Sequence, residues 1–80
     1  MQSKPFLEKI NQSSVVQQVI DALTNAMIAR QLRPGDKIPT ERELAESLGV
    51  GRMSIRGAVK VLVYFGVLEV RRPEGTFVRE

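Results

Sequence analysis

A break of only three residues, 49–51, separates two amphipathic helix patterns in this 80-residue sequence. Upstream of the break, Thr40 and Glu43 have capping-box spacing, in which each side chain accepts a hydrogen bond from the other residue's backbone N–H. Downstream, residues 52–65 place their apolar side chains on one side of a helix. Two helices joined by a short turn that contains glycine are typical of a helix-turn-helix, which we place at about residues 41–60.

A further helix and a hairpin are expected on either side of this pair. Apolar residues follow helical spacing from a cap at Ser13 or Ser14 to about Gln31, just before an Arg-Pro-Gly-Asp turn. After the last helix, residues 67–71 and 76–79 have the pattern of two short strands joined by a turn. A hairpin that follows a helix-turn-helix is a wing.

The predicted fold is therefore mainly α with a small β-hairpin, a three-helix winged helix-turn-helix. We assign residues 13–80 to this domain, with the wing at about 67–79, and residues 1–12 to an N-terminal arm or a single amphipathic turn. The chain is long enough for one small domain. It has no Cys and no His, so helix packing rather than disulfides or structural zinc must stabilise it.

Composition also limits the classes of function. The longest apolar stretch is too short to span a bilayer and the N-terminus lacks a signal-peptide core, so we expect a soluble cytoplasmic domain without membrane contact. We expect no metal and no cofactor in this domain. Catalysis is set aside because the sequence offers no His or Cys and no serine with a base partner.

The net charge of +3 is unevenly distributed along the chain. Residues 1–50 hold six basic and six acidic side chains, whereas residues 51–80 hold six basic and three acidic ones. This asymmetry fits either a polyanionic partner or an ordinary solvated surface.

The second helix of the pair carries a basic stripe, Arg52, Arg56 and Lys60, one turn apart and away from its apolar side. The major groove of duplex DNA admits one α-helix, and residues near the start of that helix reach base edges. We expect Arg52 and Arg56 to contact bases, where arginine binds guanine through two hydrogen bonds, and Lys60 to contact phosphate. A merely solvated face is the alternative. The same surface is expected to include Gly51, Met53, Ser54 and Gly57, the last allowing close approach of DNA or being simply tolerated.

Two flanking regions extend the expected interface. Arg42, in the first turn of the preceding helix, is placed to contact the DNA backbone, unless it forms a salt bridge with Glu46. In the wing, Arg71 and Arg72 precede the tip, and the Gly75 backbone and the Thr76 hydroxyl can approach the minor groove or a phosphate. Glu74 argues against contact there, and an ordinary β-turn is the alternative.

Five motifs occur in a specific order along the chain. They are Leu32–Ala45 (LRPGDKIPTERELA), Leu48-Gly49-Val50, Ile55-Arg56, Gly66-Val67-Leu68 and Gly75-Thr76-Phe77-Val78. Over about residues 13–79 they resemble the N-terminal DNA-binding domain of the GntR family of bacterial transcriptional regulators. The resemblance is greatest to the FadR-like subfamily.

This resemblance implies binding to a short near-palindromic operator in double-stranded DNA as a homodimer, with a repressor expected over an activator. Arg42, Arg52 and Arg56 match DNA-contacting arginines of the family, and Gly75 matches the glycine of its wing. A small-molecule effector is expected only through a C-terminal domain that this sequence lacks. We therefore expect the chain to be a fragment of a longer regulator.

The sequence departs from the family pattern at the start of its recognition helix. Family members usually have Ser or Thr where this chain has Gly51, Thr-Pro or a similar pair at residues 53–54, and Glu at Gly57. The missing hydroxyls remove two phosphate contacts. The operator sequence of relatives therefore cannot be transferred to this chain.

Two other functions compete with sequence-specific DNA binding. Val61, Val63 and Tyr64 make the end of the last helix apolar nearly all round, as in a winged helix that contacts protein. Alternatively, the chain is the head domain of a regulator fused to an aminotransferase-like domain, as in some GntR-family proteins. The basic stripe favours DNA over protein, because a protein-binding winged helix does not need it.

Overall fold

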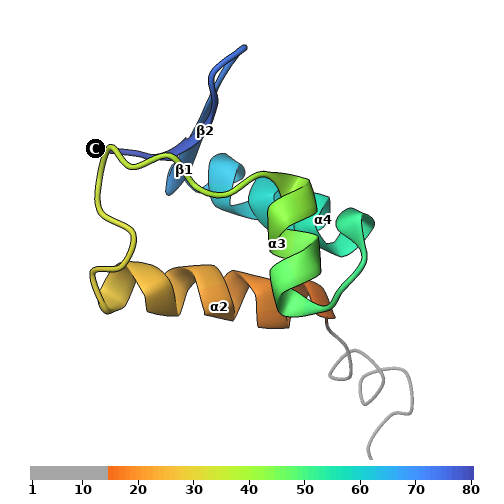
Figure 1. Cartoon of the computed structure of the whole chain (residues 1–80). Helices are drawn as coiled ribbons and strands as arrows, with labels where there is room; N and C mark the ends of the chain where they lie inside the picture. Colours follow the sequence, from red (N-terminus) through yellow and green to blue (C-terminus); the bar gives the residue numbers. More distant parts are fainter. Residues whose placement is uncertain (1–14) are drawn as a thin grey trace, which may run out of the picture.

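The computed structural model describes residues 15–80, and within them it contains three helices followed by an antiparallel hairpin, as predicted (Figure 1). In chain order the elements are α2 (Val15–Ile28), α3 (Glu41–Leu48), α4 (Arg52–Tyr64), β1 (Leu68–Arg71) and β2 (Gly75–Val78). The expected arm at 1–12 and the expected helix cap at Ser13 or Ser14 lie outside the described residues.

Helix α2 ends at Ile28, earlier than the prediction of about Gln31. Arg30 adopts the left-handed conformation with a φ of 65°, and the chain closes around it in a Schellman arrangement. The Gln31 N–H donates to the Ala26 carbonyl at 2.8 Å, and the Arg30 N–H donates to the Met27 carbonyl at 3.0 Å. The sequence gives no signal for this helix end, because glycine or asparagine usually occupies the left-handed position.

Helix α3 begins with the predicted capping box. The Thr40 hydroxyl accepts a hydrogen bond from the Glu43 N–H at 3.1 Å, and the Glu43 carboxylate accepts one from the Thr40 N–H at 2.9 Å. At the other end Gly49 has a φ of 70° and donates its N–H to the Ala45 carbonyl. The turn that follows leads directly into α4, so α3 and α4 form the predicted helix-turn-helix.

The hairpin is tied to the segment that precedes α3. β1 and β2 pair in antiparallel register. Beside β2, the Val78 N–H donates to the Asp36 carbonyl and the Ile38 N–H donates to the Thr76 carbonyl, both at 2.8 Å. The base of the hairpin is therefore fixed relative to the start of the helix-turn-helix.

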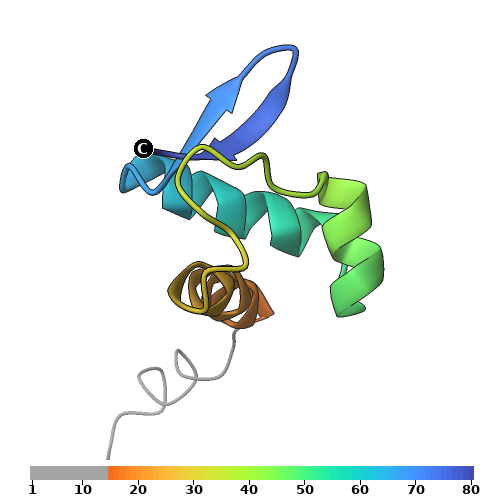
Figure 2. The same cartoon turned by 60° about the vertical axis from the view of Figure 1, so that its left-hand side comes forward.

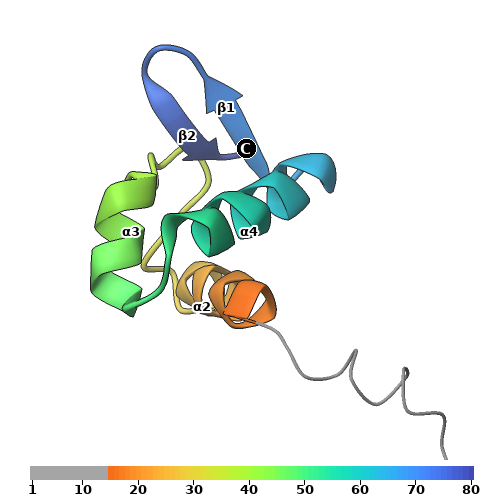
Figure 3. The same ribbon diagram turned by 90° about the vertical axis from the view of Figure 1, so that its right-hand side faces the viewer.

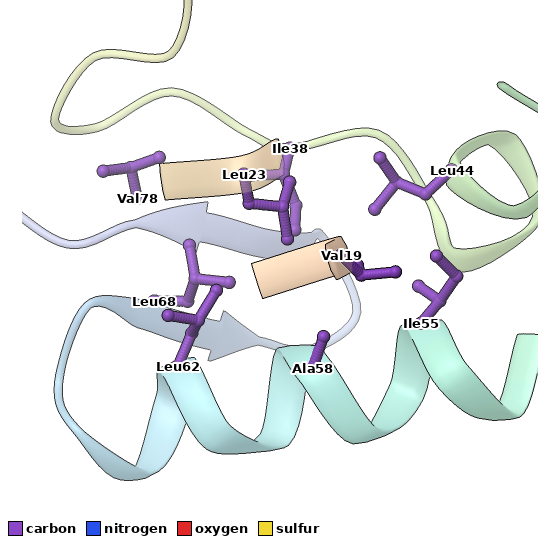
Figure 4. Close-up of a cluster of buried hydrophobic side chains, with 9 residues drawn as sticks. All are labelled: Val19, Leu23, Ile38, Leu44, Ile55, Ala58, Leu62, Leu68 and Val78. Atoms are coloured by element: carbon purple, nitrogen blue, oxygen red, sulfur yellow. The ribbon is translucent and has the colours of Figure 1, made fainter. Parts of the chain in front are cut away.

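Helix α4 lies between α2 on one side and the hairpin on the other (Figure 2, Figure 3). The core fills the space between these elements (Figure 4). Among the described residues, the buried hydrophobic side chains are Val19, Leu23, Ile38, Leu44, Ile55, Ala58, Leu62, Leu68 and Val78. Because α4 supplies Ile55, Ala58 and Leu62 to this core, its opposite face points outward.

Candidate nucleic-acid interface

The outward face of α4 carries the basic stripe. Ile55 and Ala58 have 0% exposure, whereas Arg52, Arg56 and Lys60 are all exposed. The division of the helix into a buried apolar face and an exposed basic face, predicted from spacing, is confirmed for Ile55 and Ala58. Phe65, which the spacing placed on the apolar side, lies just after the helix and is 71% exposed.

Arg56 forms an ion pair across the helix-turn-helix that the sequence did not predict. Its Nη2 donates to Glu41 Oε1 at 3.0 Å and its Nε donates to Glu41 Oε2 at 3.3 Å. The hydrogen bond from Arg56 lowers the pKa of the Glu41 carboxyl, against the opposing effect of partial burial. The same hydrogen bond raises the pKa of the Arg56 guanidinium. Each partner thus stabilises the charge of the other.

The other two cations of the stripe are free. Within residues 15–80, neither Arg52 nor Lys60 has an ion-pair partner. Next to Arg52, Gly51 is exposed, Met53 is 74% exposed and Ser54 is half-buried. The first turn of α4 therefore offers both a free guanidinium and accessible neighbours to a partner.

Gly57 faces a different element from the one expected. An ideal Cβ at this position would lie 3.5 Å from Val16 Cγ2, so the position points toward α2 rather than along the basic stripe. This contradicts the placement of Gly57 beside the stripe, and it fits the alternative that glycine is simply tolerated at this position. The spacing suggested the stripe side because it did not show how far α2 reaches around α4.

Arg42, on the first turn of α3, does form the alternative ion pair with Glu46, but weakly. Arg42 Nε lies 3.6 Å from Glu46 Oε2, and the two side chains are 75% and 71% exposed. An exposed pair four residues apart in a helix contributes only about 0.3–0.5 kcal/mol. Arg42 thus remains available to another anion.

The two adjacent arginines of the wing have different surroundings. Arg71 Nε donates to Glu69 at 3.0 Å, and its guanidinium lies 4.4 Å from the centre of the Phe77 ring. Arg72 is exposed and, with Thr76, lines a groove between the wing and α4 whose other wall includes Arg56 and Lys60. The structure therefore brings Arg72 and Thr76 beside Arg56 and Lys60, whereas Arg71 makes its contacts within the hairpin.

Lys37 is a basic residue near the wing tip that sequence reasoning missed. A Cβ added at Gly75 would lie 2.7 Å from Lys37 Cε, so the lysine side chain lies directly over this glycine. Gly75 has a φ of 138°, which disfavours any side chain there as well. The sequence does not predict this contact, because it forms only when the segment before α3 pairs with β2.

The end of α4 carries exposed apolar side chains, which the sequence suggested for Tyr64 but not for Phe65, whose spacing placed it on the apolar side of the helix. Tyr64 is 83% exposed and Phe65 is 71% exposed, and their rings pack edge to face with centroids 5.2 Å apart.

Over the described part of the chain, no group of acidic, His or Cys side chains is arranged to hold a metal ion. None of the helices described has both the length and the apolar character needed to cross a membrane.

Comparison with known proteins places this arrangement in a family. The model of “Bacterial regulatory proteins, gntR family” matches residues 15–78. The “HTH-type transcriptional regulator Mce2R” of Mycobacterium tuberculosis (strain CDC 1551 / Oshkosh) is 36% identical over 74 residues, which are 92% of this chain and 31% of that protein. The “Putative L-lactate dehydrogenase operon regulatory protein” of Escherichia coli (strain K12) is 45% identical over 62 residues, which are 78% of this chain and 24% of that protein. The chain thus spans about a third or less of these relatives.

Solved structures show the same fold. The crystal structure of AraR(DBD) in complex with operator ORR3 is similar with a TM-score of 0.75 and 38% identity, covering 80% of this chain and 77% of that one. The complex with operator ORX1 gives a TM-score of 0.78 and 33% identity, covering 98% and 92%. The hairpin is therefore the wing of a winged helix, and these relatives are transcriptional regulators rather than enzymes. By its sequence and its fold, the chain belongs to the GntR family of bacterial regulatory proteins.

Proposed function

We propose that the chain binds double-stranded DNA sequence-specifically, as the operator-reading domain of a bacterial transcriptional regulator. The observation that carries the proposal is the basic stripe, exposed on α4 beside the wing. The fold around the stripe also supports the proposal, because AraR(DBD), which is similar in fold and sequence, was solved in complex with operators.

In the proposed complex the first half of α4 enters the major groove. Arg52 and Arg56 contact base edges and Lys60 neutralises a phosphate, because Arg52 and Arg56 are nearer the helix start. The surface around Arg52 that follows the groove wall consists of Gly51, Met53 and Ser54. The exposure of Gly51 and Met53, and the half-exposed position of Ser54 beside them, support their place in the interface.

Contacts to the DNA backbone flank the major-groove helix. Arg42 contacts phosphate from α3, and Arg72 and Thr76 do so from the wall of the groove beside α4. At the wing tip, Gly75 and the Lys37 side chain that lies over it approach the minor groove or a phosphate together, and Lys37 supplies a positive charge there. Each of these cations releases counterions from DNA, so binding weakens steeply as salt rises.

The wider biology is part of the same proposal. The regulator binds a near-palindromic operator as a homodimer in the bacterial cytoplasm and acts as a repressor. A further domain, of the FadR-like type, binds the small-molecule effector. Support comes from the greater length of the relatives, of which this chain matches about a third or less, and from the motifs in residues 32–45.

Selection from random duplexes tests this function. The chain is mixed with duplexes of random sequence, and the retained DNA is sequenced. We expect enrichment of a short inverted repeat, called the enriched duplex below. The triple variant Arg52→Ala, Arg56→Ala, Lys60→Ala should fold but enrich nothing. Retention without enrichment would contradict base reading, and no retention at low salt would contradict DNA binding altogether.

The exposed rings at the end of α4 support a second candidate function. Tyr64 and Phe65 form an exposed aromatic pair, with Tyr64 also lining the groove beside the wing, and such a surface is of the kind that contacts a protein. If the chain retains no DNA at low salt, this surface becomes the first place to look for a protein partner.

A further inference from the structure

Within the part of the chain that the structure describes, Glu41 is the one acidic residue in ion-pair contact with the basic stripe. We propose that Glu41 is a positioning residue that sets the sequence preference of the DNA interface, because it orients Arg56 for a base edge and withholds it from phosphates. This inference rests on the proposed function and names a specificity-determining residue within it.

The geometry of the pair leaves one edge of Arg56 available. Arginine has five N–H donors, arranged as a side fork on Nε and Nη2 and an end fork on Nη1 and Nη2. Glu41 accepts from Nε and Nη2, so it occupies the side fork. The end fork keeps one N–H on each nitrogen, which is what a two-bond contact with guanine O6 and N7 requires. The plane of the guanidinium is thus fixed while its recognition edge stays free.

The charges point to the same role. Glu41 offsets the charge of Arg56, and its carboxylate repels any phosphate that approaches the pair. Arg52 and Lys60 have no ion-pair partner within residues 15–80, so their charges attract DNA of any sequence, in addition to the base contact of Arg52. Arg56 therefore adds to the binding affinity mainly when a base edge meets its free end fork. This contribution favours DNA that carries the matching base over DNA that does not.

The local structure holds Glu41 in place and leaves it without a substitute on α3. It is the first residue of the helix, directly after the Thr40 cap. Glu43 is engaged in the capping box and Glu46 lies beside Arg42. Neither of these carboxylates pairs with Arg56, so loss of the Glu41 charge would free Arg56 to turn toward phosphates.

The test compares Glu41→Gln with a matched control, Glu46→Gln, which removes the same charge from the same helix. Dissociation constants are measured for the enriched duplex and for a scrambled duplex over a range of salt. For Glu41→Gln we expect the affinity for the scrambled duplex to rise and the salt slope to steepen by about one. The ratio of the two affinities should fall by about tenfold, the effect of losing one base contact. Glu46→Gln should change both affinities together and leave their ratio unchanged.

The outcomes separate this inference from the function on which it rests. An unchanged ratio in Glu41→Gln, with the wild-type chain still enriching a sequence, would overturn the role of Glu41 alone. No enrichment by the wild-type chain would overturn the proposed function and this inference together. If Glu41→Gln does not fold, Arg56→Lys replaces it, since lysine keeps the charge but has no fork. That variant should hold the scrambled duplex as tightly as before and lose the preference, and a preserved preference would overturn the inference.

Discussion

The two faces of α4 differ in what they contribute to the molecule. On one face Ile55, Ala58 and Leu62 are buried in the core, and on the other the basic stripe is exposed. Truncating a buried side chain leaves a cavity, whereas truncating an exposed arginine removes little that holds the fold together. In this helix, different residues therefore determine the stability of the fold and the binding of DNA. A substitution on one face can test one of these properties without changing the other.

The largest effect is expected from Ile55→Ala, on the buried face. Ile55 has 0% exposure, and its truncation should lower the free energy of unfolding by about 2–5 kcal/mol. Urea unfolding followed by circular dichroism measures the change. Arg52→Ala, from the exposed face, should change the same free energy by no more than about 0.5 kcal/mol. If both variants lowered the free energy of unfolding equally, the two faces of α4 would not differ in their contribution to stability.

Arg52→Ala should instead act on binding. We expect it to weaken binding to the enriched duplex by about 1–3 kcal/mol and to relax the preference at one base pair. Fluorescence anisotropy with labelled duplexes measures both effects. Arg33→Ala is the matched control, because Arg33 is exposed in the turn after α2 and its loss changes the net charge equally. Similar losses in the two variants would mean that charge alone, and not the position of Arg52, matters.

Thr40→Ala tests the cap of α3, the helix that packs against α4 and carries Glu41. The Thr40 hydroxyl caps α3, and its loss should lower the free energy of unfolding by about 1 kcal/mol. Thr40→Ser keeps the hydroxyl and should retain most of this stability. Because the cap also precedes Glu41, amide hydrogen exchange in the first turn of α3 should rise in the alanine variant only. If Thr40→Ser is as unstable as Thr40→Ala, the capping hydrogen bond is not the cause.

Gly57→Ala is expected to have the smallest effect and the opposite sign. The added methyl group would meet Val16 at an ordinary van der Waals distance, and alanine favours the helix over glycine by up to about 1 kcal/mol. Thermal unfolding should therefore occur at a higher temperature, with binding to the enriched duplex unchanged. A loss of binding without a loss of stability would return Gly57 to the DNA-facing side, as the sequence first suggested.

The parts of the fold that could be predicted from sequence are local. The capping box of Thr40 and Glu43, the glycine after α3 and the spacing of apolar residues each act within a few positions, so the pattern reveals them. The early end of α2 was missed because Arg30 takes a left-handed backbone conformation that an arginine in the sequence does not predict.

The parts of the site that were missed depend on contacts between distant segments. The Arg56 and Glu41 pair joins residues 15 positions apart, across the turn of the helix-turn-helix. Lys37 reaches Gly75 only because its segment runs beside β2, which the sequence does not specify. Sequence reasoning thus identified the basic stripe but not the carboxylate that orients one of its members.

Titration of the isotope-labelled chain with the enriched duplex, followed by amide NMR, tests the central claim most directly. If the exposed face of α4 reads DNA, the largest shifts will fall at residues 51–60 and at the wing tip, residues 72–76. The amides of Asp21 and Asn25, on the solvent side of α2, should stay unchanged. Largest shifts around Tyr64 and Phe65, with the start of α4 unaffected, would contradict the claim.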